Sequence, residues 1–170
     1  VALQDTSIDE KQTGRELLYS ASPAQPCPYT PSEGDGSWGI RMQGQDVFRF
    51  AVSSSAKDLQ AAAEEAGMQV AQADWVLLHQ ANMRIIQSVR QRLGVDPARM
   101  PTNIHRLGNT SSASVPMLLY DLYHSGLLQP GHTLALSAFG AGMTSGACLI
   151  RWDKPVPHEL RDHAETLFFA

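Results

Sequence analysis

The chain has 170 residues, of which 43% are hydrophobic and 18% are charged, and its formal net charge is -4 at pH 7. A chain of this size and composition is expected to fold as one globular domain with a buried core. The negative net charge and the lack of any run of five basic residues argue against a nucleic-acid-binding surface. No eighteen apolar residues run together and no leader pattern opens the chain, so we expect a cytoplasmic protein.

Proline and glycine are concentrated between residues 22 and 44, at a density that neither a helix nor a central strand tolerates. We expect residues 22–44 to form a long loop excursion, which is either functional or a plain surface insertion. Apolar residues then recur at helical spacing from Phe48 to Ala63, and Gly67 is placed to end a helix. This pattern predicts a helix over residues 45–66.

A short apolar run, Trp75–Leu78, is typical of a strand buried on both faces, and it places His79 at the end of that strand. Apolar residues at helical spacing then predict a helix over residues 82–93, directly after the strand. A second pattern of this kind predicts a helix over residues 110–125. Pro116 falls early in it, where a first turn accommodates proline.

Two more strands are expected over residues 133–138 and 146–152, joined as an antiparallel pair by a tight glycine turn at 139–142. The order of helices and strands predicts an α/β fold, with a mixed sheet covered by helices. We place this domain over residues 1–155. Residues 156–170 are expected to form a tail that either docks on a partner or is disordered.

The two cysteines show neither metal-ligand spacing nor a framework of pairs. Cys27 lies between two prolines and is interpreted as a loop thiol, whereas Cys148 lies in an expected strand and is interpreted as a small apolar residue. Neither has the setting of an activated nucleophile, such as the start of a helix beside a base. The chain itself therefore offers no cysteine nucleophile.

Three clusters of polar or glycine residues lie at the ends of expected elements. The first, His79–Arg84, follows a buried strand, which is where ligands bind in open α/β sheets; a histidine satisfied by nearby backbone is the alternative. The second, Gly108–Ser114, opens a helix, and Asn109 either caps that helix or donates its amide into a cavity. The third, Ala138–Met143, is a turn whose backbone N–H groups either face a developing negative charge or belong to an ordinary hairpin.

These clusters contain three motifs in order: His-Gln-Ala-Asn-x-Arg from His79, Gly-Asn-Thr-Ser-x-Ala-Ser from Gly108, and Ala-Phe-Gly-x-Gly from Ala138. Their order and spacing resemble the ketoacyl synthase III family, whose members belong to the thiolase-like superfamily. The resemblance runs from about Met42 to Trp152 and extends back to Val1. It implies the C-terminal half of a thiolase-like fold, with a mixed five-stranded sheet. It also implies that the nucleophilic cysteine lies in an N-terminal half that this chain lacks.

The activity that the resemblance implies is acyl transfer by a decarboxylative Claisen condensation. An acyl group from an acyl-CoA primer, held on a cysteine, is joined to malonyl carried on acyl carrier protein. By position, His79 and Asn109 would hydrogen-bond the malonyl thioester oxygen, where two preorganised donors stabilise the enolate that decarboxylation creates. The backbone N–H of Ala141 would lie in the oxyanion hole that faces the acyl-cysteine. Ala141 and Met143 depart from the family's usual residues, but Ala141 keeps this N–H.

Binding residues follow from the resemblance in the same way. Asn82 would contact the pantetheine arm of CoA or of the carrier protein, and Gly44 and Phe48 would line the tunnel that the arm enters. Arg49 and Arg84 would meet the acidic carrier protein at the tunnel mouth, or they are ordinary solvated helix charges. No permanently bound cofactor is expected, because CoA or phosphopantetheine carries the substrate as a thioester.

The expected partners are acyl-CoA, acyl carrier protein, the N-terminal half of the same enzyme and a second copy in a homodimer. Two other readings of the motifs differ in activity: a non-catalytic subunit that binds acyl groups or carrier protein, and a related thiolase or hydroxymethylglutaryl-CoA synthase. Thiolases lack a counterpart of Asn109, which counts against that reading. A zinc site is not expected, because the six histidines show neither i, i+4 pairing nor a cysteine partner. The motifs fit fatty acid synthesis and polyketide synthesis equally.

Overall fold

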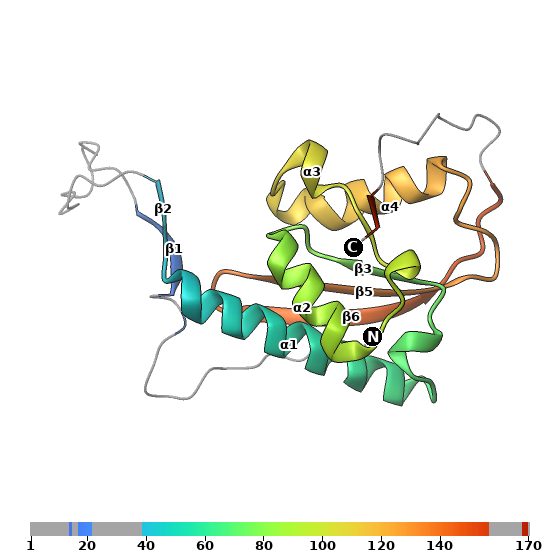
Figure 1. Ribbon diagram of the computed structural model, residues 1–170, viewed down its shortest axis with the longest axis horizontal. Coiled ribbons are helices and arrows are strands. Elements are labelled where there is room, and N and C mark those ends of the chain that lie inside the picture. The colour runs from blue at the N-terminus through green and yellow to red at the C-terminus, as the bar shows by residue number, and fades with distance from the viewer. Residues whose placement is uncertain (1–13, 15–16, 22–38, 157–167, 170) are drawn as a thin grey trace, which may run out of the picture.

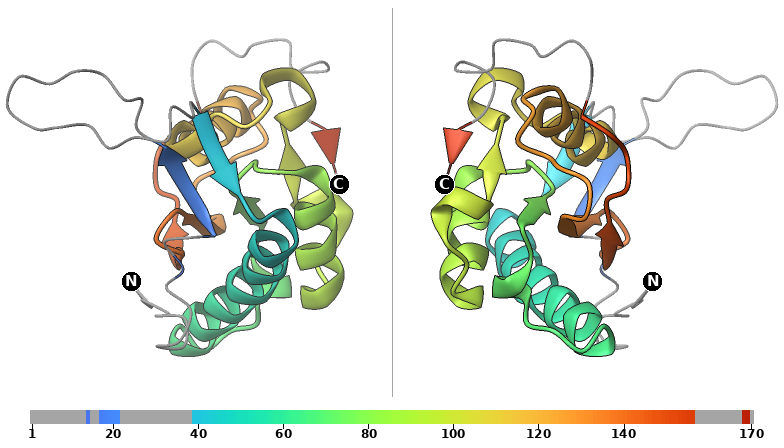
Figure 2. Two further views of the ribbon diagram at one scale, coloured as in Figure 1. Left: turned by 90° about the vertical axis from the view of Figure 1, so that its left-hand side faces the viewer. Right: turned by 90° about the vertical axis from the view of Figure 1, so that its right-hand side faces the viewer.

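The computed structural model describes residues 14, 17–21, 39–156 and 168–169. Its centre is a three-stranded mixed sheet in the order β3-β5-β6, built from β3 (Trp75–Leu78), β5 (Thr133–Gly140) and β6 (Thr144–Arg151). The first two strands run parallel and the last two antiparallel. Helices α1 (Gly44–Glu65) and α2 (Met83–Leu93) lie on one side of this sheet and α4 (Ser114–His124) on the other (Figures 1 and 2).

Shorter elements connect these layers. Strands β1 (Leu18–Ala21) and β2 (Gly39–Met42) form an antiparallel hairpin before α1. The single-turn helices are η2 (Val70–Gln72), η3 (Pro97–Arg99), α3 (Ile104–Leu107) and η4 (Ser111–Ala113). Strand β4 (Pro101–Thr102) pairs with the final strand β7 (Phe168–Phe169). In the described part of the chain, no helix has both the length and the apolar character that a bilayer span requires.

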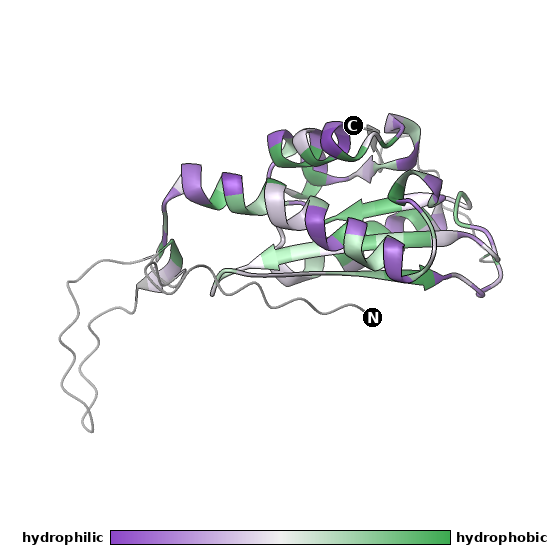
Figure 3. Cartoon of the chain, turned by 90° about the horizontal axis from the view of Figure 1, so that it is seen from below, coloured by the Kyte–Doolittle hydropathy of each residue, from purple (hydrophilic) through white to green (hydrophobic). Residues whose placement is uncertain are grey.

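The alternation of side chains along the strands divides the core into two parts. Ala135 and Ala147 face α1 and α2, together with the fully buried Leu59 and Ile86. On the other face, Leu134 packs with Leu77 and with Leu118, Leu122 and Leu128, all of them fully buried. Figure 3 shows the strands as mostly hydrophobic, whereas α1 carries hydrophilic residues as well. Burial of each such leucine contributes roughly 1.5–3 kcal/mol to folding.

The expected helices and strands of the central fold are confirmed. Strand β3 has the expected bounds, and α1 begins one residue before the expected start. Helix α2 ends at Leu93 and is capped by Gly94, which adopts the left-handed conformation that favours glycine. The expected helix over 110–125 differs, because it consists of η4 followed by α4. Ser111 has φ 53°, which a right-handed helix does not contain, so α4 starts only at Ser114.

Other expectations need correction. The mixed sheet is confirmed, but among the described residues it has three strands and not five. The expected excursion over 22–44 is wrong at its end, since Gly39–Met42 is a strand and Gly44 starts α1; residues 22–38 lie outside the described part. All four residues of β2 are exposed, and the strand is too short for the alternation of Ile40, Arg41 and Met42 to predict it. Of the tail, residues 157–167 and 170 lie outside the described part, and Phe168–Phe169 is a strand of this chain's own β4–β7 pair.

Candidate active site

His79 lies one residue beyond β3, and its backbone N–H extends the pairing with β5 by donating to the Ser137 carbonyl at 2.9 Å. Its half-buried ring packs edge-on against Phe139, with 5.2 Å between the ring centroids. Burial lowers the pKa of His79, because desolvation penalises the imidazolium form. The ring is therefore neutral at pH 7, with one N–H donor and one bare nitrogen.

A second contact of the ring comes from Ser114, the first residue of α4. The Ser114 side chain is buried, and its Oγ lies 2.5 Å from His79 Nδ1. The same Oγ accepts the backbone N–H of Gln80 at 3.1 Å. The hydroxyl thus joins the end of β3 to the start of α4. Sequence reasoning missed this role, because the contact spans 35 residues and a serine at the start of a helix has many simpler explanations.

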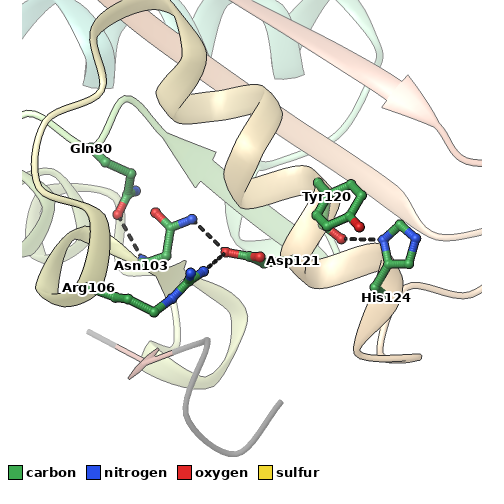
Figure 4. Close-up of polar contacts among 6 residues, drawn as sticks. All are labelled: Gln80, Asn103, Arg106, Tyr120, Asp121 and His124. Atoms are coloured by element: carbon green, nitrogen blue, oxygen red, sulfur yellow. Dashed lines mark hydrogen bonds and ion pairs between the residues drawn. The ribbon is translucent and has the colours of Figure 1, made fainter. Parts of the chain in front are cut away.

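A buried polar network holds the backbone beneath the histidine. Gln80 is fully buried, where its Nε2 donates to the Leu78 carbonyl and its Oε1 accepts the Asn103 N–H. Asn103 Nδ2 in turn donates to Asp121 Oδ2 at 2.8 Å, and Arg106 Nη2 reaches the same oxygen at 2.8 Å. Figure 4 shows this chain of contacts from the end of β3 through α3 to α4. Sequence reasoning missed it too, since its members are far apart in the chain.

Asn109 lies in the connection between α3 and α4, five residues before Ser114, and its side chain is exposed. Its Oδ1 accepts the backbone N–H of Ser111 at 2.9 Å. Ser111 is the one non-glycine residue with a positive φ in the described part of the chain. The interpretation of Asn109 as the helix N-cap is therefore wrong, because the N-cap of α4 is Ala113 and Asn109 instead closes the turn that precedes the helix. Its amide nitrogen keeps two hydrogens that can donate.

The turn between β5 and β6 differs slightly from the expected one. Phe139 and Gly140 belong to β5, and Gly140 pairs with Thr144, so the turn is formed by residues 141–143. Gly142 has φ 115°, a conformation that residues with a side chain rarely adopt. Ala141 is exposed, and its carbonyl accepts the Thr144 hydroxyl at 3.3 Å. The turn begins two residues after the ring that packs on His79.

The expected CoA and carrier-protein residues lie at the start of α1 and α2. Asn82 is the N-cap of α2, where its Oδ1 accepts the Arg84 N–H at 2.9 Å. The Arg84 guanidinium lies over the Phe48 ring at 5.8 Å and so links the two helices by a cation–π contact. Gly44 is the first residue of α1, and a Cβ placed there would meet open space.

Arg49 stands apart from this group. Its side chain is 76% exposed and pairs with Asp46 on the same helix at 3.3 Å. That pairing favours the interpretation of Arg49 as a solvated helix charge. By contrast, Phe48 and Arg84 are brought into contact. None of the contacts among the described residues joins His79, Asn109 and Ala141 directly; the partners that meet His79 are Phe139 and Ser114.

Cys148 does not have the properties of a nucleophile. It lies partly buried in β6, and burial raises the pKa of its thiol, so the unreactive protonated form prevails at neutral pH. Cys27 lies outside the described residues. No group of three histidine, cysteine or acidic side chains that could hold a metal ion occurs between residues 39 and 156. A neutral imidazole and a side-chain amide are both hydrogen-bond donors of the kind that can stabilise an oxyanion.

Residues 63–152, more than half of the chain, match the family described as 3-oxoacyl-[acyl-carrier-protein] synthase III C terminal. A relative from Arabidopsis thaliana, the chloroplastic beta-ketoacyl-[acyl-carrier-protein] synthase III, is 48% identical over 148 residues, which are 87% of this chain and 36% of the relative. The synthase III of Thermosynechococcus vestitus is 43% identical over 113 residues, 66% of this chain and 34% of that protein.

Solved structures show the same relationship. The synthase III of Thermus thermophilus superposes with a TM-score of 0.74 at 34% identity, over 89% of this chain and 44% of that one. The priming beta-ketosynthase of a polyketide pathway superposes with a TM-score of 0.72 at 33% identity, over 85% of this chain and 43% of that one. The thiolase-like fold is thereby confirmed. This chain spans less than half of the length of each of these relatives.

Proposed function

Because the chain belongs to the 3-oxoacyl-[acyl-carrier-protein] synthase III C-terminal family, we propose that it is the C-terminal part of a condensing enzyme. The reaction is decarboxylative Claisen condensation of an acyl-CoA primer with malonyl-acyl carrier protein. The observation that carries this proposal is the neutral ring of His79. It is fixed at Nδ1 by Ser114, so its other nitrogen is left to face a substrate.

In the proposed reaction, the bond between the malonyl carboxylate and its Cα breaks, CO₂ leaves, and the electron pair moves into the thioester. The resulting enolate oxygen receives hydrogen bonds from His79 and Asn109. The enolate carbon then attacks the acyl-cysteine carbonyl, whose oxyanion receives the backbone N–H of Ala141, and the cysteine thiolate is expelled. Each donor is expected to accelerate the reaction about 10²–10³-fold, since charge develops in a preorganised and dry site.

Substrate binding is assigned to the starts of α1 and α2. Asn82 retains two amide hydrogens for the pantetheine arm, because its oxygen is occupied by the Arg84 N–H. Gly44 leaves open space and Phe48 offers an apolar ring, and both are proposed to line the tunnel. Arg84 is exposed and is proposed to meet the acidic carrier protein, whereas the pairing of Arg49 with Asp46 favours a solvated helix charge at that position. CoA and phosphopantetheine act as substrate carriers, and no permanent cofactor is assigned.

The proposed partners include an N-terminal half with the cysteine nucleophile, and a second copy of the full enzyme in a homodimer. Two residues of α4 support a covered face there: Met117 is 36% exposed and Tyr120 is 44% exposed, on the side of the sheet opposite α1 and α2. The product enters fatty acid or polyketide synthesis. The proposed compartment is the cytoplasm, while the Arabidopsis relative is named as chloroplastic.

Malonyl decarboxylation in the protein that contains this chain tests the proposal. His79→Ala is expected to lower kcat about 10²–10³-fold, while binding of malonyl-acyl carrier protein stays intact. His124→Ala is the control, because His124 ends α4 at the opposite end from Ser114. If His79→Ala leaves decarboxylation unchanged, the non-catalytic binding subunit becomes the better description and the catalytic proposal fails.

A further inference from the structure

We propose that Ser114 is a positioning residue that fixes the tautomer of His79, with the hydroxyl donating to Nδ1 and the ring proton held on Nε2. The catalytic consequence of this assignment rests on the proposed function, whereas the tautomer itself does not. The observation behind it is the Oγ–Nδ1 distance of 2.5 Å between a buried hydroxyl and a partly buried ring. A bond this short joins one donor to one acceptor, so the position of the single proton decides the tautomer.

The two partners of the Ser114 hydroxyl determine whether it donates or accepts in the hydrogen bond with His79. The backbone N–H of Gln80 can only donate, and it donates to Ser114 Oγ at 3.1 Å. Within residues 39–156, the other polar contact of this oxygen is His79 Nδ1. If Nδ1 carried the proton, the hydroxyl would accept two bonds and its own hydrogen would be buried without an acceptor, which is costly. When the hydroxyl donates to Nδ1, both the hydroxyl and the Gln80 N–H are satisfied.

The surrounding network holds both sides of this hydrogen bond in place. Gln80 follows His79 directly, and its side chain bonds to the Leu78 carbonyl and to the Asn103 N–H. Asn103 is bound to Asp121, which lies two turns further along the helix that Ser114 begins. The strand end and the helix start are therefore clamped to each other. Ser114 can act on the ring orientation without touching a substrate.

The functional consequence is that Nε2 becomes a fixed donor. A neutral imidazole in the other tautomer would present a bare Nε2 to the substrate and would repel a developing oxyanion. Asn109 belongs to the same connection as Ser114, and its Oδ1 is occupied by the Ser111 N–H, so its amide hydrogens are the groups left to donate. The short segment from Asn109 to Ser114 thus supplies one donor, the Asn109 amide, and fixes the second donor, His79 Nε2, through Ser114.

The tautomer can be measured in the intact protein with ¹⁵N-labelled histidine, by long-range ¹H–¹⁵N correlation. We expect His79 to carry its proton on Nε2 in the wild type, and Ser114→Ala to populate the Nδ1–H form. Ser114→Thr retains the hydroxyl and should restore the wild-type tautomer. Ser88→Ala is the matched control, because the Ser88 hydroxyl bonds to the Arg84 carbonyl on α2 and should leave the ring unchanged.

The rate of malonyl decarboxylation gives the second readout. Ser114→Ala should lower kcat at least about tenfold with KM unchanged, since loss of the partner that orients a catalytic histidine lowers kcat by up to about 10⁴-fold in a serine protease. A wild-type Nδ1–H tautomer, or a Ser114→Ala variant with unchanged tautomer and rate, overturns the inference. A shifted tautomer in Ser114→Ala, together with full decarboxylation in His79→Ala, would uphold the tautomer assignment and overturn the proposed function.

Discussion

The side-chain amide of Asn109 has an acceptor oxygen and a donor nitrogen, and its hydrogen bond to the described residues involves the oxygen. Its oxygen closes the turn to Ser111, so the local backbone and a substrate do not compete for the same atom. Asn82 follows the same arrangement with Arg84. A role as acceptor for the backbone and a role as donor are therefore compatible in each asparagine, although the sequence presented capping and donation as alternatives.

Asn109→Asp separates the two roles. The carboxylate can still accept the Ser111 N–H, so the free energy of unfolding should change by no more than about 0.5 kcal/mol. Both amide hydrogens are lost, so kcat for malonyl decarboxylation should fall about 10²–10³-fold. Gln60→Glu, an exposed position on α1, controls for the added negative charge. Undiminished decarboxylation in Asn109→Asp would show that Asn109 serves the turn alone.

The lowered pKa of His79 predicts a pH dependence of stability. Its folded pKa is below the unfolded value, so the unfolded chain binds the proton first as the pH falls through about 6.5. The contribution of His79 to stability is thus fully present above this pH and is lost below it. Urea denaturation at pH 7.5 and pH 5.5 should show a larger loss for wild type than for His79→Gln, and equal losses would contradict the assignment.

At the scale of elements, the periodic segments were the predictable ones. Helices α1 and α2 and strands β3, β5 and β6 each show the apolar spacing of their type over enough residues to be recognised. Strands β4 and β7 have two residues each and lie far apart in the sequence. Such short strands contain no alternation of apolar and polar residues by which they could be predicted. The contacts of Ser114 and Gln80 could not be predicted either, because they depend on which elements, distant in the sequence, pack against each other.

The Asp121 carboxylate connects α4 to α3 by hydrogen bonds, so its removal should lower the stability of the fold. The carboxylate is mostly buried and accepts from Asn103 and Arg106, so Asp121→Ala leaves two donors without their acceptor. We expect a loss of about 2 kcal/mol in the free energy of unfolding, measured by urea denaturation. Asp46→Ala is the matched control, since its ion pair with Arg49 is exposed and should contribute less than about 1 kcal/mol. Equal effects of the two changes would show that the buried network adds nothing.

At the scale of the whole molecule, the topology gathers the site at one edge of the sheet. The parallel strands β3 and β5 end at the same edge, which places His79 beside Phe139 and brings in the β5–β6 turn. Helices α2 and α4 begin there as well, on opposite sides of the sheet (Figure 1). This is the edge at which open α/β sheets bind ligands. The three motifs, each about thirty residues from the next, are thus connected through the fold.

A double-mutant cycle on malonyl decarboxylation tests the central claim, that an imidazole and an amide act on one oxygen. The four proteins are wild type, His79→Ala, Asn109→Ala and the double variant. Two donors that stabilise the same charge act as a unit, so the double variant should be scarcely slower than the slower single variant. Two large single effects that multiply in the double variant would show that the residues act separately, and the shared site would be contradicted.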